Sequence, residues 1–306
     1  MASRLAAGGG GGVAGRLGSG IVSRLNENRE HDSDEESSLY KVVKILSELE
    51  ARNCALDDPI SEVIKLLDTA ITNAASQWWI DLIGEVFNEL GNLLPRDPGE
   101  LPIPFSIIPP KPLNSASLIP CATRPLGFEE FQEHLDKDTS PIRIPGILAH
   151  WPALQRWQDA AYFYSMTLGG RRLVPVEIGE NYTAADYRSE IMSFRKFMEV
   201  YVLDEEPEEV GYLAQHDLFT QIRDLQQDIV IPDYCYTSPP SPLPFSPAAL
   251  TPGFDTVQQL AEPLVHAWLG PKGTKTPLHT DPYHNILCQV VGKYYIFFSR
   301  YIVAKA

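Results

Sequence analysis

The chain has few cysteines, and other features that define common protein classes are missing from it. Its four cysteines are widely spaced and form no Cys-x-x-Cys pair, which argues against a disulfide framework or a structural zinc site and favours a reducing compartment. No uncharged apolar run reaches the roughly 18 residues of a membrane-spanning helix. Positive charge is also scarce, and the formal net charge of −15 opposes non-specific binding to nucleic acid. We therefore expect neither a membrane protein nor a protein that binds nucleic acid directly.

The length and composition predict a globular protein with a poorly ordered beginning. A chain of 306 residues with 44% hydrophobic residues has room for one sizeable domain and a smaller one. Residues 1–37 are rich in glycine and then in acidic residues, and we expect them to be disordered. Arg4, Arg16 and Arg24 precede the first acidic residue, Glu27, as in an organelle transit peptide, but the weak amphipathic pattern disfavours that interpretation.

Residues 38–95 have the apolar spacing of a small helical module. Trp78 and Trp79 lie in its last predicted helix, where large aromatic side chains at helical spacing indicate a core position. An exposed docking surface is the alternative, and it would suit a non-catalytic protein-interaction module. Residues 96–126 are rich in proline and lack periodicity, so an extended linker is expected there.

From residue 127 onward short predicted strands outnumber helices. We expect a strand over Leu173–Ile178, a helix from Phe194 to Val202 capped by Ser193, and further strands near Tyr212, Val265, Ile286 and Tyr294, the last two joined by a hairpin at Gly292 and Lys293. This order predicts an α+β protein, with an N-terminal helical module followed by a partial double-stranded β-helix, or jelly-roll, of the cupin type. A proline-rich insertion over residues 236–264 interrupts it.

The most informative stretch is TPLHTDPYHN, residues 276–285. On an extended strand alternate side chains share a face, so His279 and Asp281 would both reach one ion. An imidazole and a carboxylate are two of the three protein ligands in the facial site of non-haem iron(II) oxygenases. A surface histidine beside a turn aspartate is the alternative if the pattern is taken alone.

The surrounding sequence resembles a known family. Residues 267–298 read AWLGPKGTKTPLHTDPYHNILCQVVGKYYIFF, and four earlier segments carry the same resemblance: RIPGILAHWPAL (143–154), VPVEIG (174–179), GYLAQHDLF (211–219) and QDIVIPDYC (227–235). Together they resemble the JmjC-domain oxygenases, cupin-type enzymes that depend on iron(II) and 2-oxoglutarate. Within this family the pattern is similar to the JmjC-domain-containing protein 5 group, called lysine-specific demethylase 8 in animals, which has plant members. The resemblance covers residues 127–298.

The resemblance implies roles for individual residues. It implies that His279 and Asp281 are iron(II) ligands and that the substrate pocket contains Glu177, Gln215 and Trp268. It also implies that 2-oxoglutarate is bound by Tyr212, Thr276 and Asn285. The family has a further 2-oxoglutarate-binding lysine at the position that Tyr294 occupies here, and Lys293 lies next to it. A carboxylate and an aromatic face both attract a guanidinium or ammonium group. Taken singly, Tyr212, Thr276 and Asn285 are equally typical of a core aromatic, a strand residue and a turn former.

The third iron ligand of the family is a histidine on a later strand, and this chain ends at Ala306 without it. We therefore expect a C-terminally truncated JmjC domain over residues 127–306, with weak activity or none. His134, His150, His216 and His284 are not assigned as the missing ligand, because the site needs a third ligand from the opposing sheet.

By resemblance, the expected function is oxidation of a protein side chain, a metal-dependent oxidoreductase (dioxygenase) reaction. Lysine demethylation and arginine hydroxylation both remain open. The implied substrates are proteins or peptides with a basic side chain, histone tails among them. A role in chromatin regulation in the nucleus follows, with the cytoplasm as the alternative location. A generic cupin ligand-binding protein is a third hypothesis, supported by the fold alone.

Overall fold

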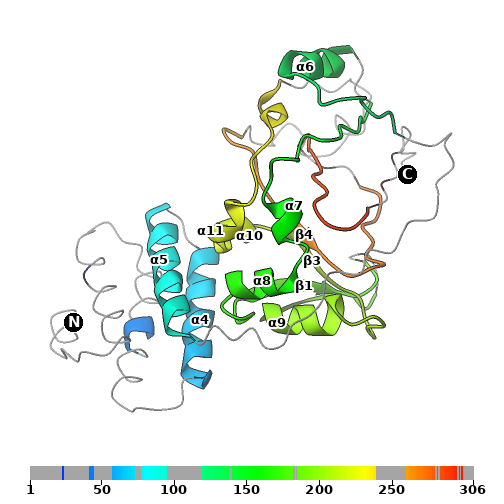
Figure 1. Cartoon of the computed structure of the whole chain (residues 1–306). Helices are drawn as coiled ribbons and strands as arrows, with labels where there is room; N and C mark the ends of the chain where they lie inside the picture. Colours follow the sequence, from blue (N-terminus) through cyan, green and yellow to red (C-terminus); the bar gives the residue numbers. More distant parts are fainter. Residues whose placement is uncertain are drawn as a thin grey trace. The chain divides into compact units, whose positions relative to one another are not determined.

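The structure is a computed structural model, and it describes part of the chain in detail (Figure 1). The described residues are 23, 41–44, 57–73, 77–94, 119–137, 140–181, 183, 185–238, 260–279, 281, 283–294, 296 and 298. They fall into two compact units. The sheet unit takes its residues from Met1–Pro102, Ala161–Gln226 and His266–Lys275, and the loop unit takes its residues from Ile103–Ala160, Gln227–Val265 and Thr276–Ala306. Among the described helices, none has the length and apolar character that crossing a bilayer requires.

Two amphipathic helices open the sheet unit, α4 (Asp57–Thr72) and α5 (Gln77–Leu93). They lie side by side and bury their apolar faces against each other (Figure 1). Trp79 is buried in this core and Trp78 packs against it, so the prediction of core positions for these aromatics is confirmed. Lys41–Lys44 form a helical turn, but the rest of the first helix predicted in the module lies outside the described residues.

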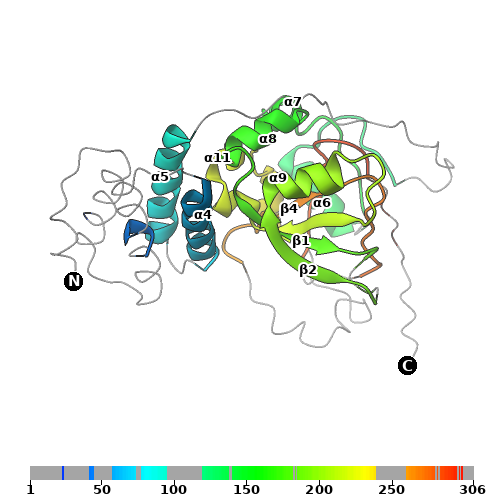
Figure 2. The ribbon, with the colours of Figure 1, turned by 90° about the horizontal axis from the view of Figure 1, so that it is seen from below.

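A four-stranded antiparallel sheet follows, in the order β2-β1-β3-β4. Its strands are β1 (Leu173–Ile178), β2 (Arg188–Ser193), β3 (Gly211–His216) and β4 (Ala267–Leu269). Alternate residues of β1 are buried, and the strand has the predicted bounds. Ser193 accepts a hydrogen bond from the Lys196 amide and caps α9 (Phe194–Phe197), which lies across the sheet and continues as the π-helical turn η2 (Met198–Val202) (Figure 2).

A buried ionic network joins α4 to the sheet. The Asp68 carboxylate on α4 accepts hydrogen bonds from Arg172 Nε at 2.7 Å and from the Leu173 amide at 2.8 Å. Gln221 of α10 (Leu218–Gln221) donates to Asp68 at 2.9 Å, and its backbone oxygen accepts from Arg172 at 2.7 Å. The guanidinium also lies 3.5 Å from the centroid of the Phe87 ring. Burial lowers the pKa of Arg172 and contact with Asp68 opposes this, so Arg172 stays charged.

The loop unit contains α6 (Phe128–Lys137), the short helix α7 (Ala153–Arg156) and the 3₁₀ turn η3 (Asp233–Tyr236). Tyr234 packs on Phe131 with ring centroids 4.5 Å apart, and its hydroxyl donates to the Leu126 carbonyl. The fully buried Asp228 carboxylate accepts from Arg156 at 2.6 Å and from the Trp157 indole at 2.8 Å. Two further helices among the described residues are α8 (Ala160–Met166), which begins at the boundary between the units, and α11 (Arg223–Gln226) of the sheet unit.

The strands predicted near Ile286 and Tyr294, with a hairpin at Gly292 and Lys293, are wrong for the described residues. Those residues form coil and bends, although Gly292 has the positive φ of +81° that a turn there needs. The physical reason is that an alternating apolar pattern forms a strand only when a neighbouring strand pairs with its backbone. No such ladder is found among the described residues of 276–298.

Some predictions fall on residues that the structure does not describe. The predicted disordered tail (1–37) lies outside the described residues except for Ser23. Most of the predicted linker (96–126) and of the proline-rich insertion (236–264) also lies outside them. The domain boundaries drawn from the sequence therefore remain predictions.

Substitution of Asp68 by alanine should strongly destabilise the protein. It would leave the buried Arg172 guanidinium without its carboxylate, which costs about 3–5 kcal/mol. Asp81→Ala on α5 is a matched control, because the Asp81–Arg223 pair is about half exposed and such pairs contribute less than about 1 kcal/mol. Urea denaturation measures both free energies of unfolding, and equal losses would contradict the role assigned to Asp68.

Cys288 should react slowly with alkylating agents. Burial, with a smaller effect from Cys235, raises the pKa of Cys288 to about 11, whereas Cys121 is exposed. Only the thiolate reacts, so at pH 8 labelling of Cys288 should be at least about tenfold slower than labelling of Cys121, and the gap should narrow as the pH rises toward 11. Peptide mass spectrometry measures both rates, with the urea-unfolded chain as control. Equal rates in the folded chain would refute this prediction.

Candidate active site

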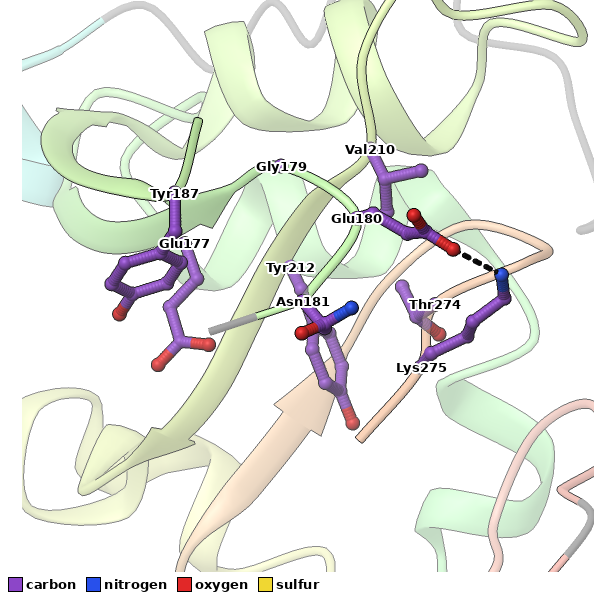
Figure 3. Close-up of a pocket in the computed structure, with 9 residues that line it drawn as sticks. All are labelled: Glu177, Gly179, Glu180, Asn181, Tyr187, Val210, Tyr212, Thr274 and Lys275. Carbon is purple, nitrogen blue, oxygen red and sulfur yellow. Dashed lines mark hydrogen bonds and ion pairs between the residues drawn. The ribbon is translucent and has the colours of Figure 1, made fainter. Parts of the chain in front are cut away.

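A pocket opens in the sheet unit where β1 ends (Figure 3). It is a shallow depression: its enclosed volume is about 10 Å³, and the empty space of about 240 Å³ around it includes open solvent. Its walls come from the end of β1 and the turn after it, from β3, and from the segment after β4; they are Glu177, Gly179, Glu180, Asn181, Tyr187, Val210, Tyr212, Thr274 and Lys275. Two residues predicted from the sequence, Glu177 and Tyr212, therefore line one cavity.

The sheet register brings Glu177 and Tyr212 together. They are direct partners across the antiparallel β1–β3 pair, which places their side chains on the same face. Burial, and then the charge and hydrogen bond of Glu177, raise the pKa of Tyr187, so the Tyr187 hydroxyl stays protonated and donates a hydrogen bond to the Glu177 carboxylate. Figure 3 shows these two side chains next to each other. The tyrosine thus orients a carboxylate that is only partly exposed to solvent.

Gln215 and Trp268 belong to the neighbouring strands of the same sheet. Gln215 lies on β3 with a φ of +49°, inside a register shift between β3 and β4. Such bulges redirect a side chain at a cost in backbone strain, and they are frequent near functional sites. Trp268 on β4 is 48% exposed, and its ring lies edge-to-face with the ring of His266. Both side chains are accessible to a ligand from solvent.

The His-x-Asp pair lies in the loop unit, in coil and not on the predicted strand. His279 Nε2 is nevertheless 3.2 Å from Asp281 Oδ1, and both side chains are a little under half exposed. Two cis ligands with bonds of about 2.1 Å to one metal ion lie about 3.0 Å apart. The separation of this nitrogen and oxygen therefore suits two adjacent positions on one ion.

The backbone fixes which nitrogen of His279 faces Asp281. Nδ1 lies 2.8 Å from the Pro277 carbonyl oxygen, which only accepts, so Nδ1 carries the proton in this hydrogen bond. In the neutral imidazole Nε2 then bears a lone pair directed at a carboxylate oxygen. A proton or a metal ion between them removes this repulsion. A carbonyl that binds the far nitrogen of a histidine ligand is a common feature of metal sites.

The chemistry and spacing of His279 and Asp281 would suit two ligands of one metal ion, and the described residues around them supply no third. Among the described residues no group of three histidine, cysteine or acidic side chains is arranged to hold a metal ion. Asn285, expected at 2-oxoglutarate, donates to Asp281 Oδ2 at 2.5 Å and thereby orients the carboxylate. Thr276 and Lys293 are exposed in coil.

Sequence reasoning missed several pocket residues, among them Glu180, Asn181, Tyr187 and Lys275. A local signal existed for one of them, because Lys275 directly precedes Thr276 in the His-x-Asp stretch. The others reach the pocket through the turn at Gly179, whose φ is +125°. The path of the chain after that turn is not encoded in residue spacing.

Comparison with known proteins gives a consistent result. The cupin-like domain family model matches residues 128–299, more than half of the chain. The chain is 42% identical over 172 residues to Lysine-specific demethylase JMJ30 of Arabidopsis thaliana, an alignment that covers 56% of this chain and 35% of that protein. It is 37% identical over 194 residues to Lysine-specific demethylase 8 of Xenopus tropicalis, covering 63% and 38%.

A third relative aligns over a longer stretch. The chain is 34% identical over 257 residues to Jumonji C domain-containing protein 5 of Drosophila melanogaster, covering 83% of this chain and 57% of the relative. The chain thus spans between about a third and just over half of the length of these curated relatives. With an antiparallel sheet preceded by helices and a family match over most of residues 127–306, the chain belongs to the cupin-like domain family and has JmjC-domain proteins of the lysine-specific demethylase 8 group as its relatives.

Proposed function

We propose that this chain is part of a JmjC-type oxygenase that uses iron(II) and 2-oxoglutarate to oxidise a protein side chain. The observation that carries the proposal is the 3.2 Å approach of His279 Nε2 and Asp281 Oδ1, with the far imidazole nitrogen held by a backbone carbonyl. Dioxygen would be the oxidant, and bound iron(II) with 2-oxoglutarate, which is converted to succinate and CO₂, would supply the chemistry that activates it, while the protein supplies ligands and orientation. His279 and Asp281 are the proposed ligands, and Asn285 holds Asp281 in place.

The proposed substrate group is a basic side chain. Glu177 is a carboxylate held by Tyr187 at a pocket wall, and the exposed Trp268 offers an aromatic face on the same sheet. A guanidinium or ammonium group is attracted to both. Two relatives are named as lysine-specific demethylases, which favours lysine demethylation, and arginine hydroxylation would use the same recognition. Histone tails are candidate substrates, and a nuclear location follows from them.

Tyr212 and Thr276 remain the proposed contacts to 2-oxoglutarate, and Lys293 is a weaker candidate. Tyr212 lines the pocket with Glu177, so a co-substrate at Tyr212 would adjoin the basic side chain. His279 and Asp281 would be two of the three iron ligands of the family, and metals held by fewer protein donors bind more weakly. We therefore propose that this chain alone is weakly active or inactive.

Metal binding tests the ligand assignment without relying on activity. Replacement of His279 by alanine removes one of two proposed ligands, so the affinity for Mn²⁺, a redox-stable substitute for iron(II), should fall at least about tenfold. His284→Ala is the matched control, because His284 is an exposed histidine of the same segment and should leave the affinity unchanged. Titration followed by electron paramagnetic resonance measures both. Identical Mn²⁺ affinities of the two variants would contradict the assignment of His279 as a metal ligand.

Measurement of turnover tests the proposal that this chain alone is weakly active or inactive. The purified 306-residue chain, supplied with iron(II), 2-oxoglutarate and arginine- or methyllysine-containing peptides, should form succinate at no more than the rate seen for the His279→Ala variant. Robust succinate formation that requires iron(II) and His279 would show that two ligands suffice or that a third is recruited. That result would contradict the proposal that the chain is weakly active or inactive, and it would support the proposal that it is an oxygenase.

A further inference from the structure

The pocket of the sheet unit contains an ion pair of its own. Lys275 Nζ donates to Glu180 Oε1 at 2.6 Å. Figure 3 shows this pair on one side of Tyr212, and Glu177 with Tyr187 on the other side. The pocket therefore holds two carboxylates and one ammonium group, and the two carboxylates differ in their partners.

The two carboxylates are not equivalent. Glu177 has the Tyr187 hydroxyl as a hydrogen-bond donor and, within the described part of the chain, no cationic partner. Glu180 is neutralised by Lys275, and this contact lowers the pKa of the Glu180 carboxyl. The pocket thus carries about one uncompensated negative charge, located at Glu177.

The Lys275–Glu180 pair is poorly suited to a purely structural role. Both side chains are 63% exposed. An ion pair so accessible to water contributes little to folding stability, so the pair can be altered without unfolding the protein. Its position at the pocket wall gives it a different effect, because it changes the electrostatic potential that an entering cation meets.

We propose that Lys275 is a specificity-determining residue, which neutralises Glu180 so that the pocket accepts a side chain with a single positive charge and disfavours a second one. The proposal rests on the proposed function, in that Glu177 receives a basic group. It adds a residue that no motif marked and a rule for the ligand's charge: monocations are preferred to dications of similar size.

Binding of two small probes tests this rule without iron or turnover. The probes are N-acetyl-arginine amide, a monocation, and 1,4-diaminobutane, a dication, titrated into the whole chain and followed by nuclear magnetic resonance. Lys275→Met frees Glu180 as a second carboxylate, so the dication should bind about tenfold more tightly and the monocation about threefold. Lys272→Met is the matched control, an exposed lysine of the same turn that does not line the pocket, and it should change neither affinity.

A charge-restoring pair of variants separates this role from a structural one. Glu180→Gln leaves Lys275 as a cation beside Glu177 and should weaken monocation binding about threefold to tenfold. The double variant Glu180→Gln with Lys275→Met returns the pocket to one net negative charge and should restore the monocation affinity. Because the Lys275–Glu180 pair is exposed, the differences in probe affinity between the variants and the unmodified chain should decrease as salt is added.

The outcomes distinguish the two proposals. One outcome is that Glu177→Gln abolishes probe binding, while Lys275→Met leaves both affinities unchanged, as Lys272→Met does, or the double variant does not regain the monocation affinity. That outcome overturns the role of Lys275 and leaves the assignment of the pocket to a basic side chain intact. If Glu177→Gln binds both probes as the unmodified chain does, or the unmodified chain binds neither, the assignment of the pocket to a basic group fails and the role of Lys275 fails with it.

Discussion

One buried carboxylate, that of Asp68, connects segments that are far apart in the sequence. It accepts hydrogen bonds from Arg172, from the Leu173 amide and from Gln221, and so joins α4, β1 and α10. A carboxylate and a guanidinium taken out of water are tolerated only when their partners are complete. Since Leu173 begins β1 and Glu177 lies near its end, the network on α4 fixes the strand that carries the pocket carboxylate. The N-terminal helices are therefore part of the support of the site.

The functional groups are oriented by backbone features more than by regular structure. Gly179 turns the chain after β1 with a φ of +125°, and a Cβ there would lie 3.3 Å from the Tyr187 backbone. This close approach is what allows Tyr187 to reach Glu177. In the loop unit, the Pro277 carbonyl sets the direction of the His279 ring. In each unit, therefore, a short coil segment next to a charged side chain sets the direction of a functional group.

Elements whose signal is local were predicted well. The bounds of β1 follow from alternating apolar residues, and the start of α9 follows from the cap at Ser193. The segment that contains Ile286 and Tyr294 has the same kind of apolar pattern, but its described residues form coil with exposed side chains. The difference is that β1 has partners on both sides, whereas pairing with a distant strand is not visible in a local pattern.

The sequence by itself determined the family, the helices α4 and α5, the strand β1 and the start of α9, because spacing and motif order are local properties of the chain. It also proposed His279 and Asp281 as candidate ligands. Only the tertiary structure decided that Lys275 pairs with Glu180, that Tyr187 donates to Glu177, and that Asn285 binds Asp281. Each of these contacts depends on where a turn directs the chain. The effect of a charged side chain depends on its distance from other charges, and folding sets that distance.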